Sequence, residues 1–558
     1  MSSRALPIGD YGAPETTPRP LRAERFFIAL AAAIYLWLFA TVIPSGDGQV
    51  YARHIDAGEW VWNPNHLLMD PVGMVWLLAL RVIDPDFPAL TGLKLISGIT
   101  TVLSLLLFHC VLVESGIRSG MVRLLCVLGL FASRNFLTMA VSEEIFMLQM
   151  PLLMFALLQL SKILTRPNQA RMRSAIMLGS ALGLATAVTI HNAFLCAAIV
   201  LFLLASADSF KAGVHRALPV AAAAAGVAAP LFLLAYLFAS PGTGFVEWML
   251  AYQGSEENPS AALYGLSLTL DDVLSSLARL VLNTFTNLLS VGYLGTVLKS
   301  VVFGAPLEIK VNVAQVALGS GLLVTIMAIC AVLIAWVFRR WRTDALVRVS
   351  LAWMAGYYAF NFYWNDSSDQ FWFQNLPVVW LLFALFVREE PAGRTSGQRK
   401  LLLIVTVPIL LVLNTSQEIA PLRFQDVDRY MSDHRALFRP GDLELIPGWD
   451  DARWIALDER DTQVKQINLM NAAMRPANDA EHISKLRELV QARLAAGHRV
   501  FVARLYDRDH DPKPWDQLRK LGWPRERLQQ ELASFESRKA AVIGGIVIRE
   551  LRIPEAGQ

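Results

Sequence analysis

Apolar runs of about 20 residues recur along the first 414 positions of this 558-residue chain, and they restrict its fold more than any other feature. A helix of about 20 apolar residues has the length needed to cross the hydrocarbon core of a bilayer. Only 17% of the residues are charged, whereas soluble domains carry about 25%. The sequence therefore predicts an α-helical polytopic membrane protein with about eleven transmembrane helices. The runs lie at 26–43, 90–112, 121–139, 145–161, 174–191, 193–206, 217–239, 312–338, 349–364, 371–387 and 400–414.

The distribution of Lys and Arg indicates which loops face the cytoplasm. Basic residues occur in the N-terminal tail, 1–25, and in every second loop between the predicted spans. Because cytoplasmic loops are enriched in Lys and Arg, we expect the N-terminus inside and everything after about residue 415 outside. The run at 273–303 is also apolar, but counting it as a span would place the basic cluster after Phe338 outside. An interfacial or re-entrant helix is therefore expected there, within an outer segment at 240–311.

The composition changes near residue 415 and divides the chain into a membrane part and a terminal part. The membrane part, 26–414, contains a long first outer loop at 44–89. In 415–558 the charge rises and the apolar runs shorten, so a small extracytoplasmic α/β domain is expected. Its predicted strands lie at 454–457, 499–506 and 541–551, with a predicted helix at 480–496 that ends before Gly497.

The charge balance and the cysteines exclude two further features. The formal net charge is +3 and no basic stripe is interleaved with aromatic residues, so no nucleic-acid partner is expected. Cys110, Cys126, Cys196 and Cys330 all lie inside apolar runs. We expect buried thiols there, neither disulfides nor a metal site.

The first outer loop opens with the polar stretch PSGDGQVYARHIDAG, which resembles an amphipathic helix lying on the bilayer. Asp47 stands at its start and is a candidate catalytic carboxylate, with a turn or helix-capping aspartate as the alternative. His54 is a candidate substrate-binding residue, with a structural role as the alternative. One helical face is predicted to carry Tyr51, His54, Ile55 and Gly58.

Asn65 and His66 follow in the same loop, within the sequence NPNH. Their side chains can hydrogen-bond a sugar, which makes them candidate substrate-binding residues. A turn held by hydrogen bonds from the Asn side chains explains them equally well.

The short linker after the third predicted span carries two adjacent carboxylates, Glu143 and Glu144. Neighbours in a helix point in different directions, so at most one of them can face a cavity. Both are candidate catalytic residues, and marking the water boundary is the alternative. Arg134 lies in the preceding apolar run, where an unpaired charge is costly. We expect it to pair with one of the two glutamates and to contact substrate.

Five more polar residues stand at predicted outer positions and are candidates for substrate binding. His191 lies at the turn between the fifth and sixth spans, and Glu247 follows the seventh. Arg279 and Lys299 lie in the expected interfacial helix, where they hold a lipid phosphate or snorkel to headgroups. Asp369 precedes an aromatic, proline-containing span.

Three of these features together resemble the GT-C class of membrane glycosyltransferases. They are an acidic residue after the first span (Asp47), an acidic residue after the third (Glu143 or Glu144), and the late segment SSDQFWFQNLPVVWLL. The late segment is similar to the ERF- or ERY-type segments of several mannosyltransferases. Asp369 and Gln370 stand where such a family has Glu and Arg, so a phosphate contact there does not carry over.

The resemblance implies a polyprenyl-phosphate sugar as donor and a lipid, glycan or protein as acceptor. It further implies a hexosyl- or pentosyltransferase of the bacterial inner (plasma) membrane, with the first-loop carboxylate, Asp47, as base or metal ligand. Sugar transfer needs a base for the acceptor hydroxyl and a positive partner for the departing phosphate. Lys, Arg or a divalent cation such as Mg²⁺ or Mn²⁺ would supply the positive charge, and the metal stays unassigned.

Two other readings fit a polytopic membrane protein. A secondary transporter keeps ionisable groups near the middle of the membrane and often contains repeats, whereas here these groups cluster in outer loops. Another lipid-linked envelope polysaccharide enzyme, a ligase or a polymerase, is the second alternative.

Overall fold

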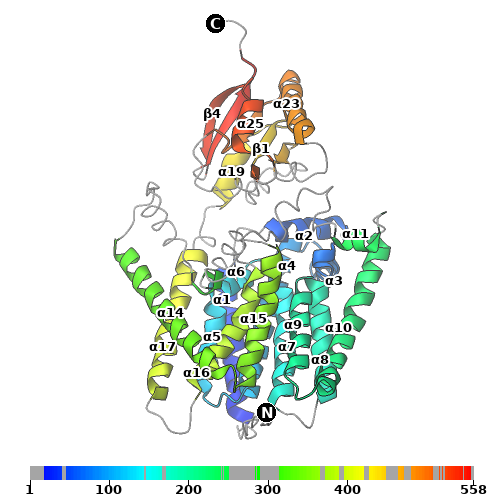
Figure 1. Ribbon diagram of the computed structural model, residues 1–558. Coiled ribbons are helices and arrows are strands. Elements are labelled where there is room, and N and C mark those ends of the chain that lie inside the picture. Colours follow the sequence, from blue (N-terminus) through cyan, green and yellow to red (C-terminus); the bar gives the residue numbers. More distant parts are fainter. Residues whose placement is uncertain are drawn as a thin grey trace.

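The computed structural model consists of a helix bundle up to residue 419 and a five-stranded sheet with flanking helices beyond residue 442 (Figure 1). The structure describes residues 18–40, 46–143, 146–165, 171–239, 244–250, 283–284, 286–289, 313–364, 371–388, 395–419, 427–447, 463–469, 479–506, 522–543 and 546–554, with the single positions 242, 515, 518 and 519.

Helices account for most of the described bundle. In chain order they are α1 (Pro18–Phe39), α2 (Gly46–Ala57), η1 (Pro64–His66), α3 (Met69–Arg81), α4 (Ala89–Glu114), α5 (Gly120–Ala132), α6 (Arg134–Val141), α7 (Phe146–Thr165), α8 (Arg171–Val188), α9 (Asn192–Ala205), α10 (Phe210–Ala239), α11 (Phe245–Leu250), α14 (Val313–Arg340), α15 (Ala345–Trp364), η4 (Phe373–Asn375), α16 (Leu376–Val387), α17 (Thr395–Asn414) and η5 (Thr415–Ile419).

The predicted spans fall on these helices, and the chain is a helical membrane protein. Within the described residues, four helices are long and apolar enough to cross a membrane, and a fifth crossing results if α5 and α6 count as one. The four lie at Ala89–Glu114, Phe146–Thr165, Phe210–Ala239 and Arg399–Gln417. Eleven crossings therefore stay a prediction. The expected interfacial helix at 273–303 lies almost entirely outside the described residues.

The span predicted at 121–139 is not one continuous helix. The chain bends by 68° between α5 and α6, because Ser133 adopts an extended conformation with ψ of 133°. Side chains satisfy the polar groups at this break: Trp380 Nε1 donates to Ser133 Oγ at 2.9 Å, and Asn414 Nδ2 donates to the Ala132 carbonyl at 2.7 Å. A helix break inside a membrane protein is tolerated when neighbouring helices supply such partners.

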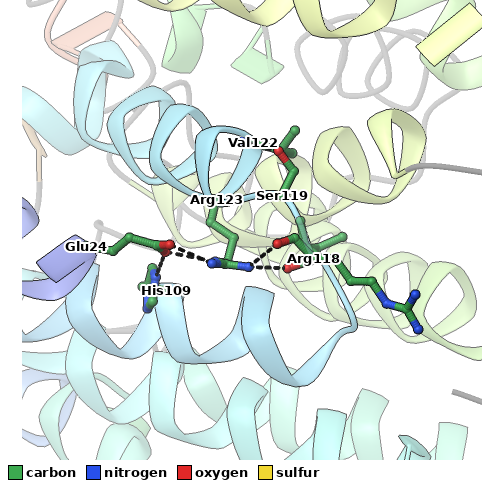
Figure 2. A network of polar contacts seen from close by, with 7 residues as sticks. Glu24, His109, Arg118, Ser119, Val122 and Arg123 are labelled. Carbon is green, nitrogen blue, oxygen red and sulfur yellow. Dashed lines mark hydrogen bonds and ion pairs between the residues drawn. The ribbon is translucent and has the colours of Figure 1, made fainter. Parts of the chain in front are cut away.

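A buried ionic network holds α1 against α4 and α5 (Figure 2). Glu24 accepts hydrogen bonds from Arg123 Nη2 at 2.6 Å and from Nε at 2.9 Å, and its Oε2 lies 2.7 Å from His109 Nε2. Arg123 Nη1 also donates to the carbonyls of Ile117 and Arg118. Four of the five N–H donors of the guanidinium are thus used. The network joins three helices at the end of α4 distant from α2.

Glu24→Ala is expected to lower the free energy of unfolding by about 3–5 kcal/mol, because it removes one partner of a buried ion pair. The measurement is thermal unfolding of the purified protein. The matched control is Asp56→Ala, which breaks an exposed ion pair with Arg81 and is expected to cost about 0–1 kcal/mol. Equal effects of the two substitutions would contradict the structural role of the network.

The terminal part contains a mixed sheet of strand order β2-β1-β3-β5-β4. The strands β1, β2 and β3 are parallel, and β5 pairs antiparallel with both β3 and β4. Apolar side chains from one face of β1 and β3 pack with α23 and α25. The bounds are β1 (Leu443–Ile446), β2 (Lys465–Asn468), β3 (Val500–Ala503), β4 (Glu536–Ile543) and β5 (Ile546–Arg552), with α19 (Val427–Leu437), α23 (Asp479–Ala495) and α25 (Arg525–Glu531).

Of the elements predicted in this part, two are found, one is corrected and one lies outside the described residues. The helix predicted at 480–496 is α23, followed by Gly497 at φ +80°, and the strand predicted at 499–506 contains β3. The run at 541–551 is not a single strand, because it joins the end of β4 to β5 in an antiparallel pair. The strand predicted at 454–457 lies outside the described residues.

Candidate functional site

The polar stretch after α1 forms the predicted amphipathic helix, α2, which packs on α3 and α4 (Figure 1). Tyr51 and Ile55 are buried on its inner face and His54 is partly buried. Gly58 does not share this face, because α2 ends at Ala57 and Gly58 follows it exposed, at φ +68°. Asp47 belongs to the first turn of α2, and its side chain lies outside the described residues.

The loop after α2 is hydrogen-bonded to the turn between α8 and α9. The Asn63 side chain accepts a hydrogen bond from the Asn65 N–H at 2.9 Å. This is the turn held by an Asn side chain that was the alternative to a sugar-binding role for this segment. The Asn65 carbonyl accepts from the Ile190 N–H at 3.2 Å, and the Ala187 carbonyl accepts from the Leu68 N–H at 3.2 Å. Two segments more than 100 residues apart in sequence therefore meet here.

An aromatic cluster joins four segments at the α2 end of the bundle. Phe146, at the start of α7, lies with its ring centroid 5.9 Å from that of His66 and 6.2 Å from that of His191. Phe371, which precedes η4, lies 5.6 Å from Phe146 and 5.7 Å from His191. The predicted site residues His66 and His191 are thus brought together around one phenyl ring.

His66 of the cluster is buried in the loop after α2, and this burial lowers its pKa to about 4. The Nε2 atom of His191 lies 3.1 Å from Nε2 of Gln374. His191 therefore both hydrogen-bonds and packs in the cluster, whereas His66 contributes ring contacts to it.

The fully buried Glu143 follows α6, and its Oε2 lies 3.7 Å from the ammonium of Lys94 in α4. Lys94 is 19% exposed. Arg134 donates from Nη1 to the Thr286 carbonyl at 3.4 Å, and its expected pairing with Glu144 involves a residue outside the described ranges. Glu144 lies outside the described residues. The end of the bundle that carries α2 therefore holds a carboxylate and a cation in contact.

A second pair joins α2 to α3. Nδ1 of His54 lies 3.5 Å from Oδ2 of Asp70, which is 1% exposed. Burial raises the pKa of Asp70 to about 6, although His54 and the backbone N–H of Val61 act in the opposite direction.

Sequence reasoning missed both Lys94 and Asp70 as site residues. Lys94 could have been noticed as a single cation near the outer end of an apolar run. Asp70 belongs to the polar first outer loop, and the first turn of α3, where the structure places it, is an ordinary position for an acidic residue.

Of the predicted site residues not yet placed, Glu247 is the one that the structure describes, and it does not join this group. Glu247 is exposed on α11 and accepts from the Gly244 N–H at 3.4 Å, so it caps its own short helix. Arg279, Lys299 and Asp369 lie outside the described residues. Within the residues that the structure describes, no group of three His, Cys, Asp or Glu side chains is arranged to hold a metal ion.

An open hollow of about 640 Å³ lies between the loop after α2 and the end of α10. Trp62 stacks on Phe238 with centroids 5.8 Å apart, and Trp60 lies 5.8 Å from Trp62. The hollow is therefore largely aromatic and apolar. Its lining residues are Trp60, Val61, Trp62, Phe238 and Ala239.

Comparison with known proteins finds similarity in structure only. No protein-family model matches the sequence, and no curated protein matches it. ArnT from Cupriavidus metallidurans, bound to undecaprenyl phosphate, superposes with a TM-score of 0.51 at 10% identity, over 97% of this chain and 100% of that one.

Two structures of the oligosaccharyltransferase from Archaeoglobus fulgidus are also similar. The enzyme AglB in complex with an inhibitory peptide and a dolichol-phosphate has a TM-score of 0.50 at 13% identity, over 93% of this chain and 72% of that one. The complex with Zn and sulfate has a TM-score of 0.52 at 15% identity, over 92% and 71%. At identities this low, the superpositions establish a shared fold and nothing more specific.

Proposed function

We propose that this chain, which has the GT-C fold, transfers a sugar from a polyprenyl-phosphate donor to an acceptor. The observation that carries the proposal is the buried contact between Glu143 and Lys94 at the end of the bundle covered by α2. Burying an ion pair costs desolvation free energy, so a pair at this position suggests that its charges serve the reaction. The shared fold adds support, because two of its relatives were solved with a polyprenyl phosphate bound.

The proposed reaction assigns one role to each charged group. The acceptor oxygen attacks the anomeric carbon, the bond from this carbon to the phosphate oxygen breaks, and polyprenyl phosphate leaves with the electron pair. The proton of the acceptor hydroxyl passes to the carboxylate of Asp47. The ammonium of Lys94 meets the charge on the departing phosphate, and Glu143 orients this ammonium.

The geometry around the pair suits a lipid-linked substrate. The Lys94 side chain retains some exposure, whereas Glu143 is enclosed, so we assign the phosphate contact to Lys94. The aromatic hollow beside Trp62 offers an apolar surface at the same end of the bundle. Hexosyl and pentosyl donors, and lipid, glycan and protein acceptors, all remain within the proposal.

We also propose the placement in the membrane that the loop charges favour. The N-terminus faces the cytoplasm of a bacterial inner membrane, the chain crosses about eleven times, and residues 415–558 form an extracytoplasmic α/β domain. In this arrangement α2 and the Glu143–Lys94 pair face outward, where lipid-linked sugars are used.

The test is an assay of the purified full chain with a panel of polyprenyl-phosphate sugars and candidate acceptors, with and without chelator. We expect release of polyprenyl phosphate together with a glycosylated acceptor for one donor of the panel. A secondary transporter would move its substrate and leave the sugar–phosphate bond intact. If every polyprenyl-phosphate sugar of the panel stays uncleaved with every class of acceptor, the proposed function is rejected.

A further inference from the structure

The pair of His54 and Asp70 has no role in the reaction as written above. Asp70 is almost completely enclosed at the start of α3, and His54 is 25% exposed on α2. The Nδ1 atom of His54 is itself enclosed and faces the carboxylate. The exposed part of the ring therefore lies on the side that carries Nε2.

The carboxylate determines what the exposed nitrogen can do. A carboxylate accepts hydrogen bonds, so of the two neutral tautomers of His54 it favours the one that carries its proton on Nδ1. The Nε2 atom then has a free lone pair, which accepts a hydrogen bond from a hydroxyl group and cannot donate one to a phosphate oxygen. His54 also lies seven residues after Asp47 on α2, so the two positions share one face of the helix.

We propose that Asp70 is a positioning residue that fixes this tautomer of His54, and that His54 Nε2 accepts a hydrogen bond from a hydroxyl group of the acceptor. The inference rests on the proposed function and deepens it, because it separates an acceptor side, with Asp47 and His54, from a phosphate side with Lys94.

The kinetic test compares His54→Gln, Asp70→Asn and the double variant with the wild type. We expect each single variant to lose about tenfold in kcat/KM for the acceptor, as for one hydrogen bond, with the loss in acceptor KM and the donor KM unchanged. The amide at position 70 presents an N–H to Nδ1 and moves the ring proton to Nε2. Because Asp70 acts through His54, the double variant is expected to match His54→Gln. The proposal would be overturned if the loss in the double variant equalled the product of the two single losses. It would also be overturned if either single variant had wild-type kinetics.

A second readout does not depend on activity. Diethyl pyrocarbonate acylates accessible, unprotonated imidazole nitrogens, and mass spectrometry gives the rate at each histidine. We expect His54 to react several-fold more slowly in Asp70→Asn than in the wild type, while the exposed His215 reacts equally in both. Equal rates at His54 in two folded proteins would end the positioning role. If the wild type consumes no donor, both the proposed function and the proposed acceptor contact fail. The acylation rate of His54 then still shows whether Asp70 positions the His54 ring.

Discussion

Replacing Lys94 with Met is expected to lower the rate of sugar transfer by about 10²–10³-fold, the usual cost of losing one group that stabilises developing negative charge. In the proposed reaction this charge appears on the phosphate as polyprenyl phosphate leaves, and the Lys94 ammonium lies at the end of the bundle where this happens. The same variant takes away the ammonium beside the buried Glu143, so a loss of stability is expected as well. Initial rates and unfolding temperatures are measured on the same preparations.

The double variant Lys94→Met with Glu143→Gln separates the two effects. Removing both charges of a buried pair is often neutral for stability, so the unfolding temperature is expected to recover while the transfer rate stays low. The control is Arg81→Met, which removes a partly exposed cation from the first outer loop and is expected to leave the rate within about twofold of wild type. A double variant with wild-type rate would show that the pair only supports the fold.

Local patterns in the sequence predicted the helices well. The periodicity of PSGDGQVYARHIDAG predicted α2, and the length of each apolar run predicted a helix at that place. The break at Ser133 was missed because a serine inside an apolar run reads as an ordinary helix residue. Only the partners Trp380 and Asn414, about 250 and 280 residues away, make the break stable.

The site was less predictable, because its contacts join distant parts of the chain. Glu143 was selected as one of two glutamates, but its partner Lys94 is 49 residues earlier and was not considered. Closeness in sequence favours Arg134 as the partner, but Glu143 lies against Lys94 and Arg134 donates to the carbonyl of residue 286. Glu247 is a candidate substrate-binding residue by its place among aromatic and polar residues after the seventh predicted span. In the structure it is exposed and accepts a hydrogen bond from the Gly244 N–H at the start of its own helix.

Asp47→Asn is expected to lower sugar transfer by about 10²–10⁴-fold, because an amide cannot accept the proton of the acceptor hydroxyl. The substitution also tests the structural alternative directly. Asp47 is the second residue of α2, where exchanging its carboxylate for an amide costs no more than about 1 kcal/mol through the helix dipole. If Asp47 only supports the start of α2, Asp47→Asn would therefore lower the stability by no more than this amount and leave the rate unchanged.

The decisive comparison for Asp47 is rate against stability in three proteins. Asp47→Asn should be slow and as stable as the wild type, with donor binding retained, since the phosphate contact belongs to Lys94 in the proposed site. Glu247→Gln, at an exposed carboxylate of the same end of the bundle, should be indistinguishable from the wild type. The double variant Asp47→Asn with Glu143→Gln tests both carboxylates at once. Full activity of that protein would show that neither Asp47 nor Glu143 takes part in the reaction.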